Sequence, residues 1–293
     1  MCKFSSGCGT SDSKSCRKCG AKLCKGCSRS LITGAAPPSG NSAQCPQYKI
    51  TFKRYKFFKV IVMIMMGSRL NRVLCYEIDR LRPTQCAAGM KHVQRKVNEL
   101  KTLKEEKGAD KVIEFLYGHP APVILKQNDI YLIDNHHLCR ALYELKGEFF
   151  EDLDFSKYDK DFDGKVSGDP KCFVKVVSDL TDKQTMQEFW EKMEEERWVH
   201  PYDHNGNGPL PHHEIPSHIK DLKDDIWRSV AALVKIQGGF KKSMVPYAEF
   251  RWANFFRGEL QSDCDLPFEE LVDKSMKLSK SSKAKELPGF TGL

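Results

Sequence analysis

The chain has 293 residues, of which 40% are hydrophobic, so it is long enough for one large domain or two small ones with a buried core. Its net charge of +8 is unevenly distributed: residues 1–60 hold 12 Lys and Arg against the single acidic Asp12, whereas residues 61–293 hold 35 basic and 38 acidic residues. This balance argues against a nucleic-acid-binding surface spread over the whole long region, and it assigns non-specific attraction to polyanions to the N-terminal arm.

No apolar run approaches the roughly 20 residues that a membrane-spanning helix needs. The run Val60–Met66 is too short, follows Lys59 and begins too far from Met1 for a signal peptide. We therefore expect a soluble intracellular protein, cytoplasmic or nuclear. In such a compartment most of the 12 cysteines should be thiols or metal ligands.

Residues 1–48 are a cysteine-rich, basic arm that includes the linker-like segment Ala35–Ser42. The spacing of two CxxC pairs suits tetrahedral zinc, and the expected ligands are Cys16, Cys19, Cys24 and Cys27. Residues 15–32 resemble part of a FYVE-type zinc finger, which implies that the two pairs bind different zinc ions and that each needs a partner pair elsewhere. The alternatives are one zinc on all four thiolates, or a reduced arm without metal.

From residue 70 onward, apolar periodicity predicts an alternation of strands and helices. The predicted strands are Arg72–Ile78, Pro122–Leu125, Ile130–Ile133 and Cys172–Val177, with a hairpin between the second and third. The predicted helices are Met90–Leu103, Val112–Leu116, Leu138–Leu145, Thr181–Arg197 (capped by Thr181), Ile219–Ile236 and Val245–Phe256. Residues 266–293 are rich in Lys and Ser, and Met276–Lys285 is expected to be a frayed tail.

Two acidic segments carry parts of a calcium-binding pattern. The run from Asp159 to Gly164 begins like a calcium loop, but Pro170 stands where the bidentate Glu is needed. The segment from Asp203 to Glu214 matches the whole EF-hand pattern, but three prolines crowd the loop and its exit. We expect no tight calcium site in either segment.

The turn between the strand Ile130–Ile133 and the following helix is the main candidate site. A helix N-terminus has unpaired backbone N–H groups and a partial positive charge, so it binds phosphate readily. Asp134 or Asn135 is expected to cap this helix, and the other polar residues of the corner are His136, His137 and Arg140. The alternative is an ordinary capped first turn with no ligand.

Four motifs in a fixed order place this corner in a family. They read LRPTQ at residues 81–85, HPAPVIL at 119–125, LIDNHHLCRAL at 132–142 and WVHPYD at 198–203. Together they resemble the ParB-like nucleases of the ParB/sulfiredoxin-fold superfamily, over roughly residues 70–265. The resemblance implies a mixed α+β fold, in which a small sheet is surrounded by helices and followed by a helical C-terminal part. It also places the superfamily's phosphate-handling turn on Asp134–Arg140.

The first functional hypothesis is therefore a nuclease or another phosphohydrolase or phosphotransferase. The backbone N–H groups of residues 135–138 would hold the phosphate of a nucleotide or nucleic acid, and Arg140 would balance its charge. His136 or His137 would act as general base or bind a divalent metal such as Mg or Mn, because imidazole titrates near neutrality, and Asp134 would orient a histidine or hold the metal. Further expected pocket residues are Pro83, Thr84, Gln85, His200 and Asp203.

The second hypothesis is a non-catalytic module that responds to nucleotide or DNA through the same corner, with salt-dependent help from the basic arm. A third is a redox role like that of sulfiredoxin, which needs a cysteine in the phosphate turn. Cys139 lies inside the expected helix instead, so this reading ranks last. The sequence alone leaves open whether the protein is an enzyme.

Overall fold

The computed structural model describes residues 14–15, 22–23, 72–159 and 168–292 of the chain. The chain divides into two units, Met1–Arg69 and Leu70–Leu293. In the first unit, β1 (Lys14–Ser15) pairs antiparallel with β2 (Lys22–Leu23). The four cysteines expected to bind zinc lie outside the described residues, so that site stays a prediction. Within the described ranges, every helix is too short or too polar to cross a membrane.

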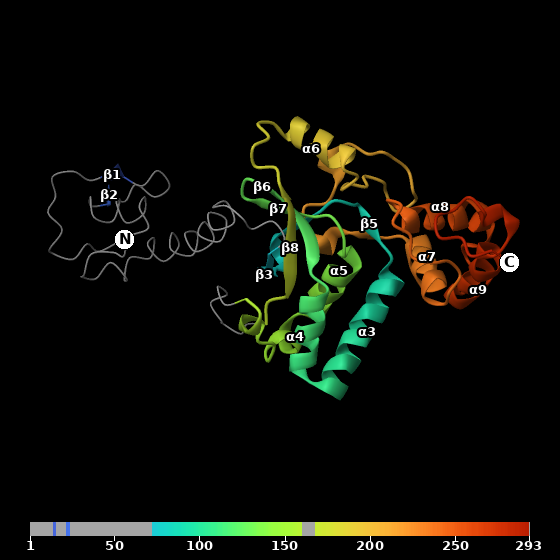
Figure 1. Cartoon of the computed structure of the whole chain (residues 1–293), viewed down its shortest axis with the longest axis horizontal. Coiled ribbons are helices and arrows are strands. Elements are labelled where there is room, and N and C mark those ends of the chain that lie inside the picture. Colours follow the sequence, from blue (N-terminus) through green and yellow to red (C-terminus); the bar gives the residue numbers. More distant parts are fainter. Residues whose placement is uncertain (1–13, 16–21, 24–71, 160–167, 293) are drawn as a thin grey trace. The chain divides into compact units, whose positions relative to one another are not determined.

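The second unit is built on a five-stranded mixed sheet (Figure 1). Its strands are β3 (Val73–Glu77), β4 (Leu81–Pro83), β6 (Ala121–Lys126), β7 (Asp129–Leu132) and β8 (Lys171–Asp179), in the order β3-β8-β6-β7-β4. β6 and β7 form the predicted hairpin, whereas β8 runs parallel to β6 and β4 runs parallel to β7. A separate parallel pair joins β5 (Ala87–Ala88) to β9 (Lys223–Asp224).

Helices cover both faces of the sheet and continue beyond it (Figure 1). They are α3 (Met90–Lys107), α4 (Ala109–Gly118), α5 (His136–Leu145), α6 (Met186–Glu195), α7 (Ile226–Ile236), α8 (Ala248–Leu260) and α9 (Phe268–Ser279). Ile124 and Tyr131, opposite each other in the hairpin, pack against Phe189 and Met193 of α6. Because side chains alternate along a strand, their neighbours point to the other face, where α4 and α5 contact β8.

These elements confirm the mixed α+β fold class for the part of the chain that the structure describes. Two predicted helix starts were wrong. α6 is capped by Thr185, which forms a reciprocal capping box with Glu188, rather than by Thr181. α7 begins after Asp225, whose side chain accepts the N–H of Trp227, because residues 223–224 pair with β5 and cannot be helical.

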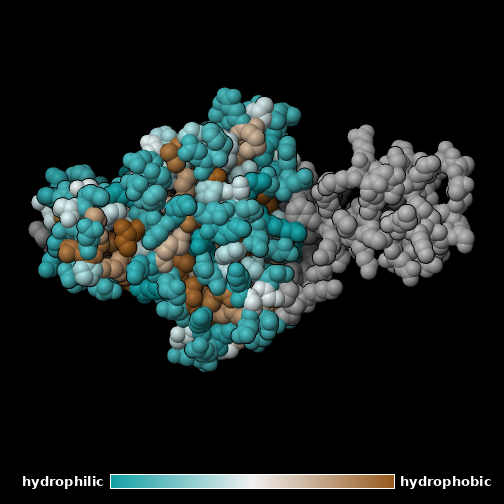
Figure 2. Space-filling view, turned by 180° about the vertical axis from the view of Figure 1, so that it is seen from behind, coloured by the Kyte–Doolittle hydropathy of each residue, from teal (hydrophilic) through white to brown (hydrophobic). Residues whose placement is uncertain are grey.

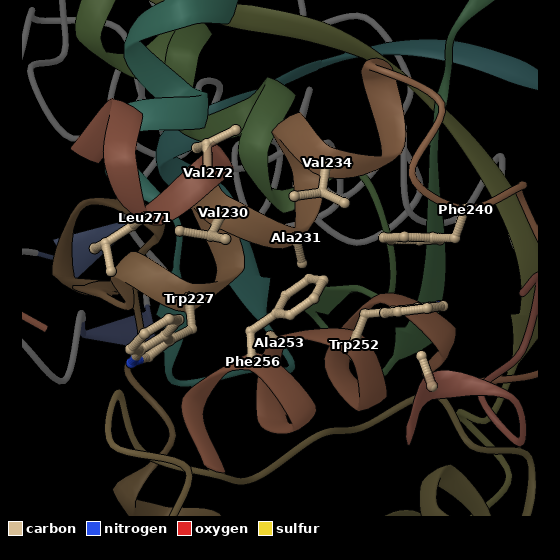
Figure 3. Close-up of a cluster of buried hydrophobic side chains, with 11 residues drawn as sticks. Trp227, Val230, Ala231, Val234, Phe240, Trp252, Ala253, Phe256, Leu271 and Val272 are labelled. Carbon is tan, nitrogen blue, oxygen red and sulfur yellow. The ribbon is translucent and has the colours of Figure 1, made fainter. Parts of the chain in front are cut away.

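The prediction of a frayed tail over Met276–Lys285 was also wrong. Residues 268–279 form α9, whose Leu271 and Val272 are buried in a cluster with α7 and α8 (Figure 3). Trp252 is fully buried in that cluster and donates its indole N–H to the Pro288 carbonyl at 2.8 Å. The lysines of this segment hid an amphipathic helix, because only its one apolar face is needed for packing.

The surface of the unit is mostly hydrophilic on the face seen in Figure 2, with apolar residues gathered in small patches. Single exposed apolar side chains are normal for a folded protein. The large apolar side chains that the structure describes as more than one third exposed are Tyr117, Val177, Met186, Ile236, Met244 and Val245. Met244 stands apart, because 92% of it is exposed.

Replacing Leu271 by Ala should lower the free energy of unfolding by about 2–4 kcal/mol, since it leaves a cavity in the α7–α8–α9 core. Urea denaturation followed by tryptophan fluorescence measures this. Lys277→Ala, on the exposed side of α9, is the matched control and should change stability little. If both variants unfold at the same urea concentration, residues 266–293 do not belong to the cooperative unit.

Candidate functional site

The parallel pairing of β4 with β7 sets the position of the candidate site. Pro83 lies opposite Leu132 in the register, so Thr84 and Ile133 leave the sheet side by side. The Thr84 hydroxyl donates to the Leu132 carbonyl at 2.8 Å and holds the two strand ends together. The backbone N–H of His200 donates to the Thr84 carbonyl at 2.8 Å, which brings the WVHPYD motif to the same edge.

A cavity of about 420 Å³ opens at this edge. Its walls come from the strand ends, from the start of α5, from residues 197–200, from α7, and from the segment 240–250 that leads into α8. Of the residues expected from sequence, the cavity is lined by Thr84, Gln85, Asp134, His136, His137 and His200. Pro83, Asn135, Arg140 and Asp203 are not among its lining residues in the described part of the chain.

The start of α5 differs from the expected capped turn. Asn135 occupies the N-cap position in a left-handed conformation, with φ of 62°, and its side chain makes no cap hydrogen bond. Its amide donates to the Pro120 carbonyl at 3.3 Å, while Asp134 accepts the N–H of Asn135 at 2.7 Å. The prediction that Asp134 or Asn135 caps the helix was therefore wrong. The first N–H groups of α5 have no N-cap side chain on them and remain suited to an anion.

The two histidines of the corner are engaged with the backbone. His136 Nε2 accepts the N–H of Thr84 at 3.2 Å, and His137 Nε2 accepts the N–H of Gly89 at 3.0 Å. Burial, assisted by the positive charge of Arg228, lowers the pKa of His136 to about 3 and that of His137 well below its usual value. Both imidazoles are neutral at pH 7. The argument from titration near neutrality does not hold for them, and their predicted role as base or metal ligand stays untested.

Arg140 has a different environment from the one expected. Its guanidinium Nη1 donates to the carbonyls of Ile219, Lys220 and Leu222, at 3.2, 2.6 and 3.4 Å, and its Nε pairs with Glu144 at 2.7 Å. Only 16% of the side chain is exposed, so the guanidinium is already engaged within the fold. These contacts tie α5 to the segment before α7.

Two arginines line the cavity, Arg197 and Arg228, and the more deeply buried one is Arg228, in the first turn of α7. Its guanidinium carbon lies 3.5 Å from the centre of the Phe250 ring, and the His200 ring lies 3.6 Å from the same ring centre. Arg228 is only 7% exposed, yet it has no carboxylate or other hydrogen-bond partner among the described residues. Burial lowers the pKa of Arg228, but a guanidinium starts so high that it stays charged at pH 7.

Nearby carboxylates do not neutralise this charge by contact. Asp225 pairs with Arg257 at 2.5 Å, and Glu249 pairs with Lys235. The lining of the cavity includes five cationic side chains and two carboxylates, which are Arg197, Arg228, Lys235, Lys241, Lys242, Asp134 and Glu249. Burial, and next the charge of Arg228, lowers the pKa of His200 to about 3, so that ring is neutral as well. The cavity is electropositive.

Gln85 adds a second unsatisfied group. Its side chain is 5% exposed and lines both this cavity and a smaller hollow beside it, and its Nε2 is buried without a hydrogen-bond partner. A buried amide donor without a partner costs free energy, and an acceptor in the cavity would satisfy it. Asp203 lines only the smaller hollow, where its carboxylate accepts the N–H groups of Asn205 and Asn207.

Within residues 72–159 and 168–292, no group of three or more His, Cys, Asp or Glu side chains is placed to hold a metal ion. The Nε2 lone pairs of both corner histidines already accept backbone N–H groups. Binding of a divalent ion at the corner stays a prediction.

Arg228 is the residue that sequence reasoning missed. It stands in the run Ile226–Val234, where the surrounding side chains Trp227, Val230 and Ala231 are buried. A single charge inside an apolar helical run is a usable signal, because a charge on a buried helix face is rare unless it is paired or functional. Lys241 and Lys242 gave no such signal, since lysines in a loop are ordinary.

Comparisons with known proteins agree with this architecture. The family model described as "Putative ParB-like nuclease" matches residues 74–258. The crystal structure of protein Atu1540 from Agrobacterium tumefaciens is 32% identical and aligns with a TM-score of 0.57, covering 76% of this chain and 98% of that one. No curated protein matches the chain.

Arg140→Ala should lower the free energy of unfolding by about 2 kcal/mol, because three carbonyls lose a charged donor. Urea denaturation at pH 7 tests this. Arg95→Ala is the control, since its exposed pair with Glu99 should contribute less than about 1 kcal/mol. Equal stability of the two variants would mean that the carbonyl contacts contribute nothing and that Arg140 is free for a ligand.

Acid should destabilise the fold through the corner histidines. A histidine with a pKa of about 3 in the folded state takes up its proton only on unfolding between pH 6.5 and 3, so acidification through that window favours the unfolded chain. His136→Gln keeps an acceptor for the Thr84 N–H but does not titrate. The loss of unfolding free energy from pH 7 to pH 5 should therefore be about 1–2 kcal/mol smaller in this variant than in the parent. An identical loss in both proteins would show that the pKa of His136 is the same in the folded and the unfolded chain.

Proposed function

The chain belongs to the ParB-like nuclease family, as the resemblance of its motifs predicted, and on that premise we propose that it binds a phosphate of a nucleic acid at Arg228 and the start of α5. The reaction that fits this placement is phosphoryl transfer, with hydrolysis of a phosphodiester as the form that the family name suggests. The proposal moves the phosphate-binding arginine from Arg140 to Arg228 and keeps the corner itself.

The observation that carries the proposal is the unpaired buried charge of Arg228. Burying a charge without a partner is costly, and proteins normally pair it or hydrogen-bond it. Arg228 also sits in the first turn of α7, where the helix dipole disfavours a cation. Neither the unpaired charge nor its place in the first turn of the helix stabilises the fold. A bound phosphate would remove both penalties, because its oxygens accept two guanidinium hydrogen bonds and carry the opposite charge.

Three further groups support an anion in the same cavity. The uncapped start of α5 offers backbone N–H groups, since His136 and His137 both line the cavity. Gln85 offers its unpartnered amide. Lys241 and Lys242 add positive charge on the wall formed by residues 240–250, where a longer nucleic acid would pass.

For hydrolysis, Asp134 is the proposed general base. It lines the cavity, and its Oδ1 accepts the N–H of Asn135, which leaves Oδ2 for a water molecule. Glu249, the other carboxylate of the lining, is paired with Lys235. In this scheme a water oxygen attacks phosphorus while Asp134 takes its proton, and the ester P–O bond breaks on the opposite side. The leaving alkoxide takes a proton from solvent, and Arg228 stabilises the charge on the non-bridging oxygens.

The alternative is a binding module that does not catalyse a reaction. The neutral protonation state of the corner histidines favours this alternative. Neutral imidazoles whose Nε2 atoms accept backbone N–H groups are poor bases. The two functions differ in one measurement. Incubation of a labelled oligonucleotide with excess protein should give cleavage that Asp134→Asn abolishes without loss of binding, if the enzyme reading is right. Binding with no cleavage in the parent protein would support the module.

Arg228→Met is the sharpest test of the phosphate site. Binding of a nucleoside monophosphate or a short single-stranded oligonucleotide, measured by calorimetry, should weaken by about 1.5–3 kcal/mol, or roughly 10- to 150-fold. The free energy of unfolding should stay the same or rise, because methionine fills similar volume without an unpaired charge.

Arg140→Met is the matched control, since it should lose stability and keep its affinity. The two arginines would thus show opposite effects. If Arg228→Met unfolds easily and binds as the parent does, Arg228 is structural and the proposal fails.

A further inference from the structure

The segment Lys241–Tyr247, hereafter the rim loop, forms part of the cavity wall and is fixed at both ends. At its start, Phe240 forms a β-bridge with Phe290, and the Lys241 N–H donates to the Gly289 carbonyl at 2.8 Å. At its end, the Tyr247 hydroxyl donates to the Val199 carbonyl at 2.7 Å, across the cavity wall. The loop is therefore anchored in the fold rather than hanging free.

Between these anchors the rim loop exposes an apolar side chain. Ser243 and Val245 line the cavity, and Met244 between them is 92% exposed. The Ser243 hydroxyl accepts the N–H of Val245 at 3.2 Å, which shapes the tip. Of the six large apolar side chains that the structure describes as exposed, three belong to residues 236–245. Among the residues that the structure describes, none covers the Met244 side chain.

The charges around Met244 indicate what could cover it. Lys241 and Lys242 precede it in the loop, and the cavity behind it is electropositive. A flexible apolar side chain next to two lysines matches the arrangement by which proteins enter a base stack. There an apolar wedge separates two bases while basic side chains contact the flanking phosphates. A purely apolar protein partner would leave these lysines without counter-charges.

The size of the cavity limits what enters it. A volume of about 420 Å³ is in the range of small-ligand sites, so it admits one nucleotide but not a double helix. Two aromatic residues, Trp198 and Tyr247, are part of its wall, and aromatic side chains are common partners of unstacked bases. A phosphate at Arg228 would therefore belong to a nucleotide that has left its stack.

We propose that Met244 is a wedge that fills the gap left by an unstacked nucleotide, so that the substrate is a nucleic-acid strand with an unpaired nucleotide in a helical context, such as a bulge. This inference rests on the proposed function, because it uses the same phosphate site, and it names the class of ligand. Free nucleotides and fully paired duplexes would bind less well, since the former lack the stack and the latter must be opened first.

The experiment compares a labelled duplex carrying one bulged nucleotide with the fully paired duplex of the same sequence, in DNA and in RNA, by fluorescence anisotropy. The parent protein should bind the bulged form at least about fivefold more tightly, in keeping with the contribution of one stacked base. Met244→Ala should lose this preference and Met244→Leu should keep it. Met186→Ala, which truncates an exposed methionine on α6, is the matched control and should behave as the parent.

A second readout reports the wedge directly. With 2-aminopurine next to the bulge, binding of the parent should raise the fluorescence as the base unstacks, and Met244→Ala should not. Equal affinity for bulged and paired duplexes, or a preference that survives in Met244→Ala, would overturn the wedge while leaving the phosphate site in place if binding still depends on Arg228. Absence of binding to every nucleic acid would overturn both proposals. The DNA and RNA arms identify which polymer is preferred.

Discussion

The site depends on the parallel pairing of β4 with β7. In a parallel pair both strands end at the same edge, so the residues that follow them emerge together. Here one end carries Thr84 and Gln85, and the other leads through Asp134 into α5. Two side chains fix this arrangement: Thr84 donates to Leu132, and His136 accepts from the N–H of Thr84. His136 thus holds the strand end against the helix start, and a neutral imidazole is required for that role.

Positive charge accumulates around this edge. The start of α5 and the first turn of α7 both present positive ends, and Arg228 adds a full charge between carboxylates that are already paired. Stacking on Phe250 offsets part of the cost but supplies no counter-charge. Residues that lower the stability of a fold are expected at a binding site, because the ligand supplies the interactions that those residues lack.

The sequence predicted the fold well where the signal is a local pattern of apolar residues. The apolar runs located β3, β6, β7 and β8, and the hairpin between β6 and β7 followed from the short polar turn 127–128. Prediction from the sequence failed where contacts between distant segments determine the structure. The pairing of residues 223–224 with β5 shortened α7, and packing of Leu271 turned an expected tail into a helix.

The site shows the same division. Three corner residues, Asp134, His136 and His137, could be named from motifs together with Thr84 and Gln85, and the structure brings these five to one cavity. The roles of the two arginines could not be predicted from motifs, because the role of a guanidinium depends on the groups that surround it. Arg140 meets three backbone carbonyls from a segment about 80 residues away, whereas Arg228 meets a ring and an open cavity.

The neutrality of the histidines and the charge of Arg228 are two sides of one arrangement. His136 is buried and His137 and His200 are partly buried, and the charge of Arg228 is the next cause after burial that lowers the pKa of each. Were one of them protonated, two buried cations would repel each other where no carboxylate contacts Arg228 among the described residues. An anion in the cavity would weaken that repulsion and raise the pKa of the rings that face it. Proton uptake by the corner and the proposed anion binding at Arg228 would therefore be coupled with the same sign, as burial and charge together require.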